Sequence, residues 1–223
     1  MLKILFQTFL FIFPWSLRRP ILNCCFGFRI AKGAKVGKSI LLCHELEMAS
    51  GATIGSLTLV KPIDRLVMGE NSNLGNLNLI TGYSTRLSNF EFFHASPDRK
   101  CEMIVGCETG ITSRHFFDCN GGIYIGSFCQ IAGYGSTFLT HSINVAENCQ
   151  EALPIRIGNY CFIGIKTTIL NDVFIADKSV VAAGAVVTKS LDVPETVYGG
   201  IPCRRIKSAE GYKFFTRKEG CVH

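Results

Sequence analysis

An aliphatic residue recurs at every sixth position through the C-terminal part of this sequence. The series in one frame is Ile157, Ile163, Ile169, Ile175, Val181, Val187 and Val193. An α-helix has 3.6 residues per turn and a strand has a side-chain period of two, so neither produces a period of six. The pattern therefore predicts repeats in which a short strand points one aliphatic side chain inward, the chain turns a corner, and the next strand repeats the arrangement.

Small and compact residues occupy two further positions of this repeat. The residue after the aliphatic position is often Gly or Ala, as at Gly158, Gly164, Ala176 and Ala182. Four residues after it lies a compact side chain: Cys161, Thr167, Val173, Ser179 and Ala185. A backbone that bends at a corner needs a small residue there, and a compact residue can fill the inside of the corner.

The same period runs upstream from Ile30, and long insertions interrupt it at about residues 82–102 and 142–154. A period-six pattern with these preferences resembles the hexapeptide-repeat family over about residues 30–207. The resemblance implies an all-β fold, a left-handed parallel β-helix of triangular cross-section built from hexapeptide repeats. It also implies a homotrimer, because family members usually pack as trimers.

Composition narrows the class of protein further. Hydrophobic residues make up 48% of the 223 residues and charged residues 18%, which excludes disorder for most of the chain. The eleven Cys are an odd number and form no C-x-x-C motif, so we expect a reducing, cytoplasmic compartment and no zinc ribbon or thioredoxin-like site. The net charge of +6 fits anionic lipid headgroups or a nucleotide-sugar, and no aromatic-basic module suggests nucleic acid.

The N-terminal segment, residues 1–28, is apolar and is expected to be helical. Its apolar run of about 14 residues is too short to span a bilayer comfortably and contains Pro14, and no signal-peptide cleavage site follows. Two interpretations stay open. Residues 1–19 contact a membrane peripherally, with Trp15 at headgroup depth and Arg18 and Arg19 on anionic lipid, or the helix caps the end of the stacked repeats.

His141 is the candidate for chemistry among the five histidines. The segment Thr137–Asn144 interrupts the repeat where a coil would close, so His141 stands at the lip of a polar loop. A neutral imidazole, with an ordinary pKa near 6.5, is suited to remove a proton from an alcohol. The alternative is a loop histidine that only bonds to backbone.

The stretch from Asp118 to Gly164, together with AAGAVVTK and GGIPCRRIK near the C-terminus, is similar to hexapeptide O-acetyltransferases that modify sugars. These include galactoside- and polysaccharide-type enzymes. The resemblance implies that His141, in Thr-His-Ser before a loop ending in Pro-Ile-x-Ile-Gly, is the general base. It also implies an acceptor-binding side chain near Asn120, so we expect Asp118 or Asn120 to bind sugar, unless both serve the corner turn. His115 is expected to face the same groove from an earlier coil.

The resemblance places the pantetheine arm of acetyl-CoA along the coils from Ile163 to Val187, in a groove between subunits. Small residues there would allow close approach of a ligand to the backbone, and cations near the C-terminal end of the helix would meet its phosphates. Phe162 stands where many relatives have Trp, so an acyl group other than acetyl stays open. The residues expected to bind acetyl-CoA are Phe162, Gly164, Ala182, Gly184, Lys189, Arg204 and Arg205.

We therefore predict that the chain consists of an N-terminal segment (1–28), a β-helix acyltransferase domain (29–207) and a basic C-terminal tail (208–223). The predicted function is acetyl-CoA-dependent transfer of an acyl group to a hydroxyl of a sugar or polysaccharide precursor, by direct attack on the thioester and with no metal. The alternatives are a non-catalytic scaffold or regulatory subunit and, with less support, a γ-type carbonic anhydrase-like metal enzyme, since His94, His115 and His141 form no close pair. Candidates to orient His141 or to contact the acceptor are the loop residues Glu147, Asn148, Gln150 and Glu151.

Overall fold

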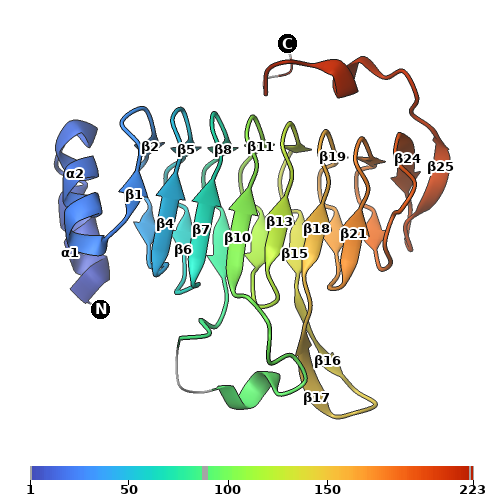
Figure 1. The fold of residues 1–223 in the computed structure, drawn as a ribbon, viewed down its shortest axis with the longest axis horizontal. Coiled ribbons are helices and arrows are strands. Elements are labelled where there is room, and N and C mark those ends of the chain that lie inside the picture. The colour runs from blue at the N-terminus through green and yellow to red at the C-terminus, as the bar shows by residue number, and fades with distance from the viewer. Residues whose placement is uncertain (1, 87–89, 221, 223) are drawn as a thin grey trace.

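A computed structural model describes residues 2–86, 90–220 and 222 of the chain. Three sheets, here called walls A, B and C, run the length of a rod, and each turn of the chain adds one strand to each wall (Figure 1). Neighbouring strands within a wall are parallel, except for the last pair of wall B. This is the triangular parallel β-helix that the resemblance to the hexapeptide-repeat family implied.

The strands are short, as a repeat of six residues requires. Wall A consists of β1 (Arg29–Ile30), β4 (Glu45–Met48), β7 (Arg65–Met68), β10 (Glu102–Val105), β13 (Ile123–Ile125), β18 (Ile155–Ile157) and β21 (Val173–Ile175). Wall B consists of β2 (Lys35–Val36), β5 (Thr53–Ile54), β8 (Asn73–Leu74), β11 (Gly110–Ile111), β14 (Gln130–Ile131), β19 (Phe162–Ile163), β22 (Val180–Val181), β24 (Thr196–Gly199) and β25 (Arg204–Ser208). Wall C consists of β3 (Ile40–Leu41), β6 (Leu59–Val60), β9 (Leu79–Thr81), β12 (Phe116–Asp118), β15 (Thr137–Leu139), β20 (Thr168–Ile169) and β23 (Val186–Val187).

The aliphatic positions of the repeat form the core inside the rod. From Ile157 to Val187 every member of the predicted series is buried. The seventh member, Val193, is 46% exposed, so its prediction as a core residue was wrong. Leu191 is buried and bridges to Ile175, and the next strand, β24, then places Tyr198 beside Val181. The inward position after Val187 is therefore taken by Leu191, two residues before Val193, and the period of six ends there.

The predicted need for small residues at the corners is confirmed by how closely the coils stack. A Cβ atom added to Gly164 would lie 2.6 Å from the backbone nitrogen of Ala183 in the next coil. At Gly158 the same atom would lie 2.7 Å from the backbone nitrogen of Asp177. Contacts this short do not occur between real atoms of these types, so glycine at these corners is required by the backbone of the following coil.

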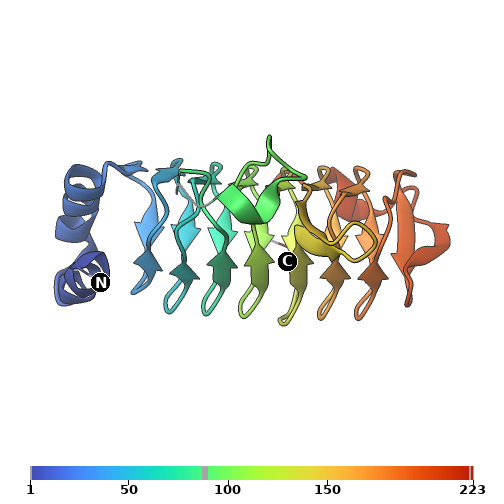
Figure 2. The ribbon, with the colours of Figure 1, turned by 90° about the horizontal axis from the view of Figure 1, so that it is seen from below.

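Both long insertions leave the rod at the edge where wall C passes into wall A. The first, between β9 and β10, contains the short 3-10 helix η1 (Phe90–Phe93). The second is a hairpin of β16 (His141–Asn144) and β17 (Cys149–Ala152). Figures 1 and 2 show the two insertions next to one another, and the Ser96 hydroxyl accepts a hydrogen bond from the Ala152 backbone at 2.9 Å.

Helices α1 (Leu2–Leu10) and α2 (Trp15–Phe26) close the N-terminal end of the rod (Figure 1). Side chains of α2 donate hydrogen bonds to carbonyl oxygens of the first coil: Trp15 to Ala34, Arg18 to Gly37, and Arg19 to Ile30. These carbonyl groups belong to a sheet edge that has no preceding strand. Trp15, Arg18 and Arg19 therefore hold α2 against the first coil.

Gln7 joins α1 to the first coil. Its side chain is 2% exposed; the amide nitrogen donates to the Leu41 carbonyl at 2.7 Å, and the amide oxygen accepts from the Leu41 backbone nitrogen at 2.8 Å. Gln7→Ala is expected to lower the free energy of unfolding by about 2 kcal/mol, because two buried backbone groups lose their partners.

Denaturant titration measures this change. Thr8→Ala is the matched control, since the exposed Thr8 hydroxyl bonds only to the Ile4 carbonyl of its own helix, and it is expected to change the free energy by less than about 0.5 kcal/mol. Equal losses in the two variants would contradict this role of Gln7.

The C-terminal tail returns along the rod after β25, which pairs antiparallel with β24 (Figure 1). It contains the 3-10 helix η2 (Lys213–Thr216). The Arg217 guanidinium donates to the Phe128 carbonyl and stacks on Phe214, 3.8 Å from the ring centroid. The tail thus lies against the rod.

Candidate active site

His141 is the first residue of the hairpin that follows β15. The preceding residue, Thr140, is fully buried; its hydroxyl donates to the Asp118 carbonyl at 2.7 Å and accepts from the Gly121 backbone nitrogen at 2.8 Å. These bonds fix the chain at the point where it leaves the rod. The His141 side chain is 37% exposed, so one part of the imidazole is held and another part meets solvent.

Asp118 lies beside His141, at the end of β12 on wall C. β12 and β15 are neighbours, with Asp118 paired to Leu139, so the register brings the carboxylate next to the start of the hairpin. Asp118 Oδ2 lies 2.5 Å from His141 Nδ1 and accepts hydrogen bonds from the backbone nitrogens of Thr140 and His141, both at 3.1 Å. The carboxyl is 1% exposed.

This hydrogen bond determines the state of the imidazole. A carboxylate accepts, so the Nδ1 proton of His141 points to Asp118 and the lone pair of the neutral ring lies on Nε2. The hydrogen bond that His141 donates to Asp118 raises the pKa of His141, and this effect is larger than the opposing effect of partial burial. The pair therefore provides a base of increased strength whose free nitrogen is Nε2.

Asn120 supports the carboxylate from the same corner. Its side-chain nitrogen donates to Asp118 Oδ1 at 2.5 Å, and its side-chain oxygen accepts from the Tyr83 backbone nitrogen at 2.8 Å. Asn120 is 2% exposed. Asp118 or Asn120 was expected to bind sugar, unless both served the corner turn; both are buried and hold His141 in position. The orienting residue is Asp118, and not one of the loop residues from Glu147 to Glu151.

The first insertion packs against one side of the His141 imidazole. The ring of Phe93, in η1, meets His141 edge-on with centroids 6.1 Å apart. The Arg99 guanidinium lies 4.4 Å from the Phe93 centroid and donates to the carbonyls of Tyr83 and Asn120 at 2.8 and 3.2 Å. Both insertions are therefore fastened to each other and to the corner that carries Asp118.

A cavity of about 350 Å³ lies between this insertion and the base of the hairpin. Cations and one aromatic ring line part of it: Arg99, Lys100, Arg156 and Tyr124, with the Arg156 guanidinium 4.4 Å from the Tyr124 centroid. Ala152, which pairs with His141 across the hairpin, also lines it. The cavity is thus adjacent to the hairpin that carries His141.

His115 does not face this site, and its predicted contact with substrate was wrong. It is 2% exposed at the corner before β12. Its Nε2 lies 2.9 Å from the Thr112 hydroxyl and its Nδ1 accepts from the Ser136 backbone nitrogen at 3.2 Å. Burial lowers the pKa of His115 to about 4, so it is a neutral structural residue. His94 is exposed on the first insertion.

The expected donor residues lie away from His141 within one chain. Gly164 and Ala182 occupy the corner between walls B and C, with wall C between that corner and His141. Gly164 is buried against the next coil, whereas Gly184 is exposed in a turn with φ of +70°. The three cations, Lys189, Arg204 and Arg205, are exposed near the C-terminal end of the rod.

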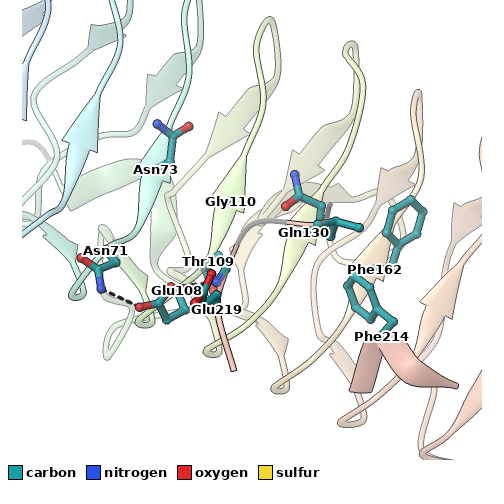
Figure 3. Close-up of a pocket in the computed structure, with 11 residues that line it drawn as sticks. Asn71, Asn73, Glu108, Thr109, Gly110, Gln130, Phe162, Phe214 and Glu219 are labelled. Carbon is teal, nitrogen blue, oxygen red and sulfur yellow. Dashed lines mark hydrogen bonds between the residues drawn. The ribbon is translucent and has the colours of Figure 1, made fainter. Parts of the chain in front are cut away.

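Phe162 lines a separate cavity of about 840 Å³ on wall B (Figure 3). Its ring meets Phe214 of the C-terminal tail edge-on, with centroids 5.9 Å apart. The tail is held here by the Gly220 backbone nitrogen, which donates to Glu108 at 2.8 Å. Phe162 therefore packs against the chain's own tail on a wall that does not carry His141.

Metal chemistry was the basis of one alternative function. Across residues 2–86, 90–220 and 222, no three His, Cys, Asp or Glu side chains are grouped so that they could hold a metal ion. His115 is enclosed by its own partners, and His141 is paired with Asp118. His115 and His141, which were considered as ligands of a shared metal ion, therefore have different hydrogen-bond partners.

Sequence comparison finds relatives over part of the chain, and no protein-family model matches it. The galactoside O-acetyltransferase of Escherichia coli (strain K12) is 45% identical over 56 residues, which cover 25% of this chain and 27% of that protein. YvoF of Bacillus subtilis (strain 168), named as an acetyltransferase, is 41% identical over 81 residues, which cover 36% of this chain and 45% of that protein. The matches thus span less than half the length of either relative.

Structural comparison covers most of the chain. A crystal structure of a variant of AntD, an N-acyltransferase from Bacillus cereus in complex with dTDP and coenzyme A, superposes with a TM-score of 0.54 at 17% identity. The match covers 79% of this chain and 84% of that one. The three-walled rod and its period of six give this chain the fold of a left-handed parallel β-helix built from hexapeptide repeats, and part of its sequence is similar to a galactoside O-acetyltransferase and to the acetyltransferase YvoF.

Proposed function

We propose that this protein is an acetyl-CoA-dependent O-acetyltransferase that acetylates a hydroxyl group of a saccharide, in the synthesis of a polysaccharide. The observation that carries the proposal is the pair of Asp118 and His141, which leaves a strengthened base half exposed between two inserted loops. The partial matches to a galactoside O-acetyltransferase and to YvoF support the reaction class. The coenzyme A complex of AntD supports the donor.

The proposed reaction has two steps at His141, addition to the thioester and collapse of the tetrahedral intermediate. Nε2 accepts the proton of the acceptor hydroxyl while the oxygen attacks the thioester carbonyl, which makes the new C–O bond. Asp118 stabilises the imidazolium that forms, as its buried carboxylate already accepts the Nδ1 proton. Collapse of the tetrahedral intermediate breaks the C–S bond, and the imidazolium returns the proton to the departing thiolate, so no acyl-enzyme is formed.

We further propose that the working site lies between subunits of a homotrimer. Within one chain, the corner that carries Gly164 and Ala182 is separated from His141 by the whole of wall C. A second copy packed along the rod would bring its own corner between walls B and C next to His141. Donor and base would then come from different subunits, and a monomer would be inactive.

The acceptor is proposed to approach from the side of the cavity beside the hairpin. Tyr124 offers a ring on which a sugar can stack, and the nearby cations suit a saccharide that carries acidic groups. We place the reaction in the cytoplasm. The free state of each of the ten cysteines among the described residues fits a reducing compartment.

Calorimetric titration with acetyl-CoA, followed by assays of acetyl transfer to galactosides and acidic oligosaccharides, tests the proposed function. One molecule bound per chain, and acetate transferred to a sugar oxygen, are the expected results. A protein that binds neither acetyl-CoA nor longer acyl-CoAs would instead be a non-catalytic scaffold.

The exposed cations of β25 allow a test of the donor end. Arg204→Ala combined with Arg205→Ala is expected to raise the KM for acetyl-CoA roughly tenfold or more with little change in kcat, because phosphate contacts contribute binding that is equal in the ground and transition states. Initial rates at varied acetyl-CoA measure both constants. Lys61→Ala, which removes an exposed cation from another part of the rod, should leave the KM unchanged; equal effects from the two variants would show only a general charge effect.

A further inference from the structure

The positive charge of this protein is concentrated at one end of the rod. Residues 1–44 contain seven Lys and Arg and no Asp or Glu, whereas the rest of the chain contains 16 basic and 17 acidic residues. The whole net charge of +6 therefore belongs to the N-terminal cap and the first coil. Four of these cations are exposed lysines: Lys3, Lys32, Lys35 and Lys38.

Helix α1 is apolar on both of its faces. Its inner face, with Gln7 and Leu10, packs on the first coil. Its outer face is uncovered: the side chains of Leu2, Leu5 and Phe9 are 82%, 59% and 56% exposed. Several large apolar side chains gathered on an exposed helix face are typical of a surface that contacts a partner or a lipid environment. Further exposed apolar side chains in the same segment are Ile4, Phe6, Ile12 and Leu17.

A hollow of about 280 Å³ opens within this apolar surface. Leu2, Phe6, Cys25 and Phe26 supply its apolar lining, and Lys3 stands among them. An apolar hollow beside an ammonium group is complementary to a lipid with an anionic headgroup. The hollow suits an acyl chain, and the lysine suits the headgroup.

We propose that the outer face of α1, together with Lys3 and the exposed lysines of the first coil, forms a docking surface for an anionic lipid membrane. Apolar side chains with adjacent cations are the composition that places a helix in the headgroup region of such a membrane. No helix among the described residues is long and apolar enough to cross a bilayer, so the contact is with one surface. The proposal is independent of the chemistry at His141.

A second copy of this chain is a poorer occupant of the same surface. Two caps placed face to face would bring eight exposed lysines together with no acidic residue from residues 1–44 of either chain. Like charges across an interface oppose association. An anionic lipid surface covers the apolar side chains and also neutralises the lysines.

Co-sedimentation of the full chain with lipid vesicles tests the proposal. We expect binding to vesicles of phosphatidylcholine with one quarter phosphatidylglycerol, much weaker binding to phosphatidylcholine alone, and loss of binding as salt screens the charges. The triple variant Lys32→Ala, Lys35→Ala, Lys38→Ala should bind the anionic vesicles roughly 100-fold more weakly, since each basic residue at such a surface contributes about fivefold.

The apolar part of the surface is tested separately. Leu5→Ser with Phe9→Ser changes exposed positions and should abolish binding to anionic vesicles. Val145→Ser is the matched control, because Val145 is 86% exposed at the far tip of the hairpin, and it should bind like the wild type. Circular dichroism and the mass in solution, measured for every variant, report whether the fold and assembly are kept.

Two outcomes would overturn the proposal. One is equal binding to neutral and anionic vesicles, or binding that survives the lysine substitutions. The other is a wild-type protein that ignores vesicles and forms a larger assembly lost in the Leu5 and Phe9 variant, which would identify another copy of the chain as the occupant. Acetyl transfer to a soluble acceptor without lipid is expected in either case, so these results are separable from failure of the proposed function.

Discussion

Replacement of His141 by alanine is expected to lower kcat for acetyl transfer by about 10²- to 10⁴-fold, which is the usual contribution of a positioned general base. The acceptor hydroxyl would keep its proton as it attacks, and no imidazolium would be present to protonate the thiolate. The side chain is 37% exposed, so its removal should leave the core of the rod unchanged. The rate of coenzyme A thiol release at saturating acetyl-CoA measures the effect.

His94→Ala is the matched control for this change. His94 is exposed on the first insertion, and the proposed mechanism does not use it, so its variant should keep activity within about twofold of wild type. Affinity for acetyl-CoA, measured by calorimetry, should be similar in both variants because the donor residues lie elsewhere. A His141→Ala protein with near wild-type kcat would remove the base from the mechanism.

Asp118→Asn is expected to cause a loss of similar size, about 10²- to 10⁴-fold in kcat, although the side chain keeps its shape. An amide cannot stabilise the imidazolium by charge. Its N–H can also donate to His141 Nδ1, which leaves the ring proton on Nε2, where the lone pair is needed. The pH dependence of kcat/KM gives a readout that a merely structural effect would not change.

The sign of that pH effect follows from the pKa of His141. In the wild type the neutral imidazole is active, so kcat/KM falls as the pH drops through the pKa of His141, which Asp118 raises above the ordinary 6.5. Asp118→Asn removes the raising interaction, so the acid limb of the profile should move to lower pH while the plateau falls. An acid limb that stays in place would contradict the positioning role of Asp118.

Glu151→Gln controls for loss of a carboxylate near the hairpin. Glu151 accepts a hydrogen bond from Asn144 at 2.8 Å within the hairpin and does not bond to His141, so its neutral variant should keep the wild-type pH profile. The free energy of unfolding of Asp118→Asn should be measured beside it, because Asp118 also accepts hydrogen bonds from the backbone nitrogens of Thr140 and His141.

The fold could be predicted from the sequence because the spacing of the inward-facing residues along the chain reflects the length of each repeat. Each repeat of six residues places one aliphatic residue inward and often a small residue at a corner, so the six buried positions from Ile157 to Val187 are visible as a period. Val193 kept the period in the sequence but not in space. The bridge from Leu191 to Ile175 ends the regular coil there, and a contact of that kind leaves no local signal.

The site was less predictable because its contacts join neighbouring coils. Asp118 and His141 are 23 residues apart, and only the register of β12 and β15 brings them together. An aspartate two residues before Asn120 is equally typical of a corner turn. His115 is similarly ambiguous: the residues that enclose it, Thr112 and Ser136, lie at the same corner of two successive coils.

The N-terminal segment was ambiguous for a different reason. A run of aromatic and aliphatic residues followed by two arginines fits both a cap and a membrane contact. In the structure, Arg18 and Arg19 of α2 bind carbonyl groups of the first coil. Leu5 and Phe9 of α1 face outward. Sequence alone could not assign the faces, because α1 has apolar residues on both.

The regular stacking of wall C fixes the distance between His141 and the N-terminal end of the rod. β15, which leads into His141, is four hydrogen-bonded neighbours from β3 of the first coil, a distance of about 19 Å at the usual strand spacing. The helical cap adds about 10 Å. With the cap on a membrane and the rod upright, the imidazole would stand about 30 Å above the lipid headgroups. A hydroxyl close to the membrane would then be out of reach, and a growing glycan anchored there would be acetylated only after it had reached this height.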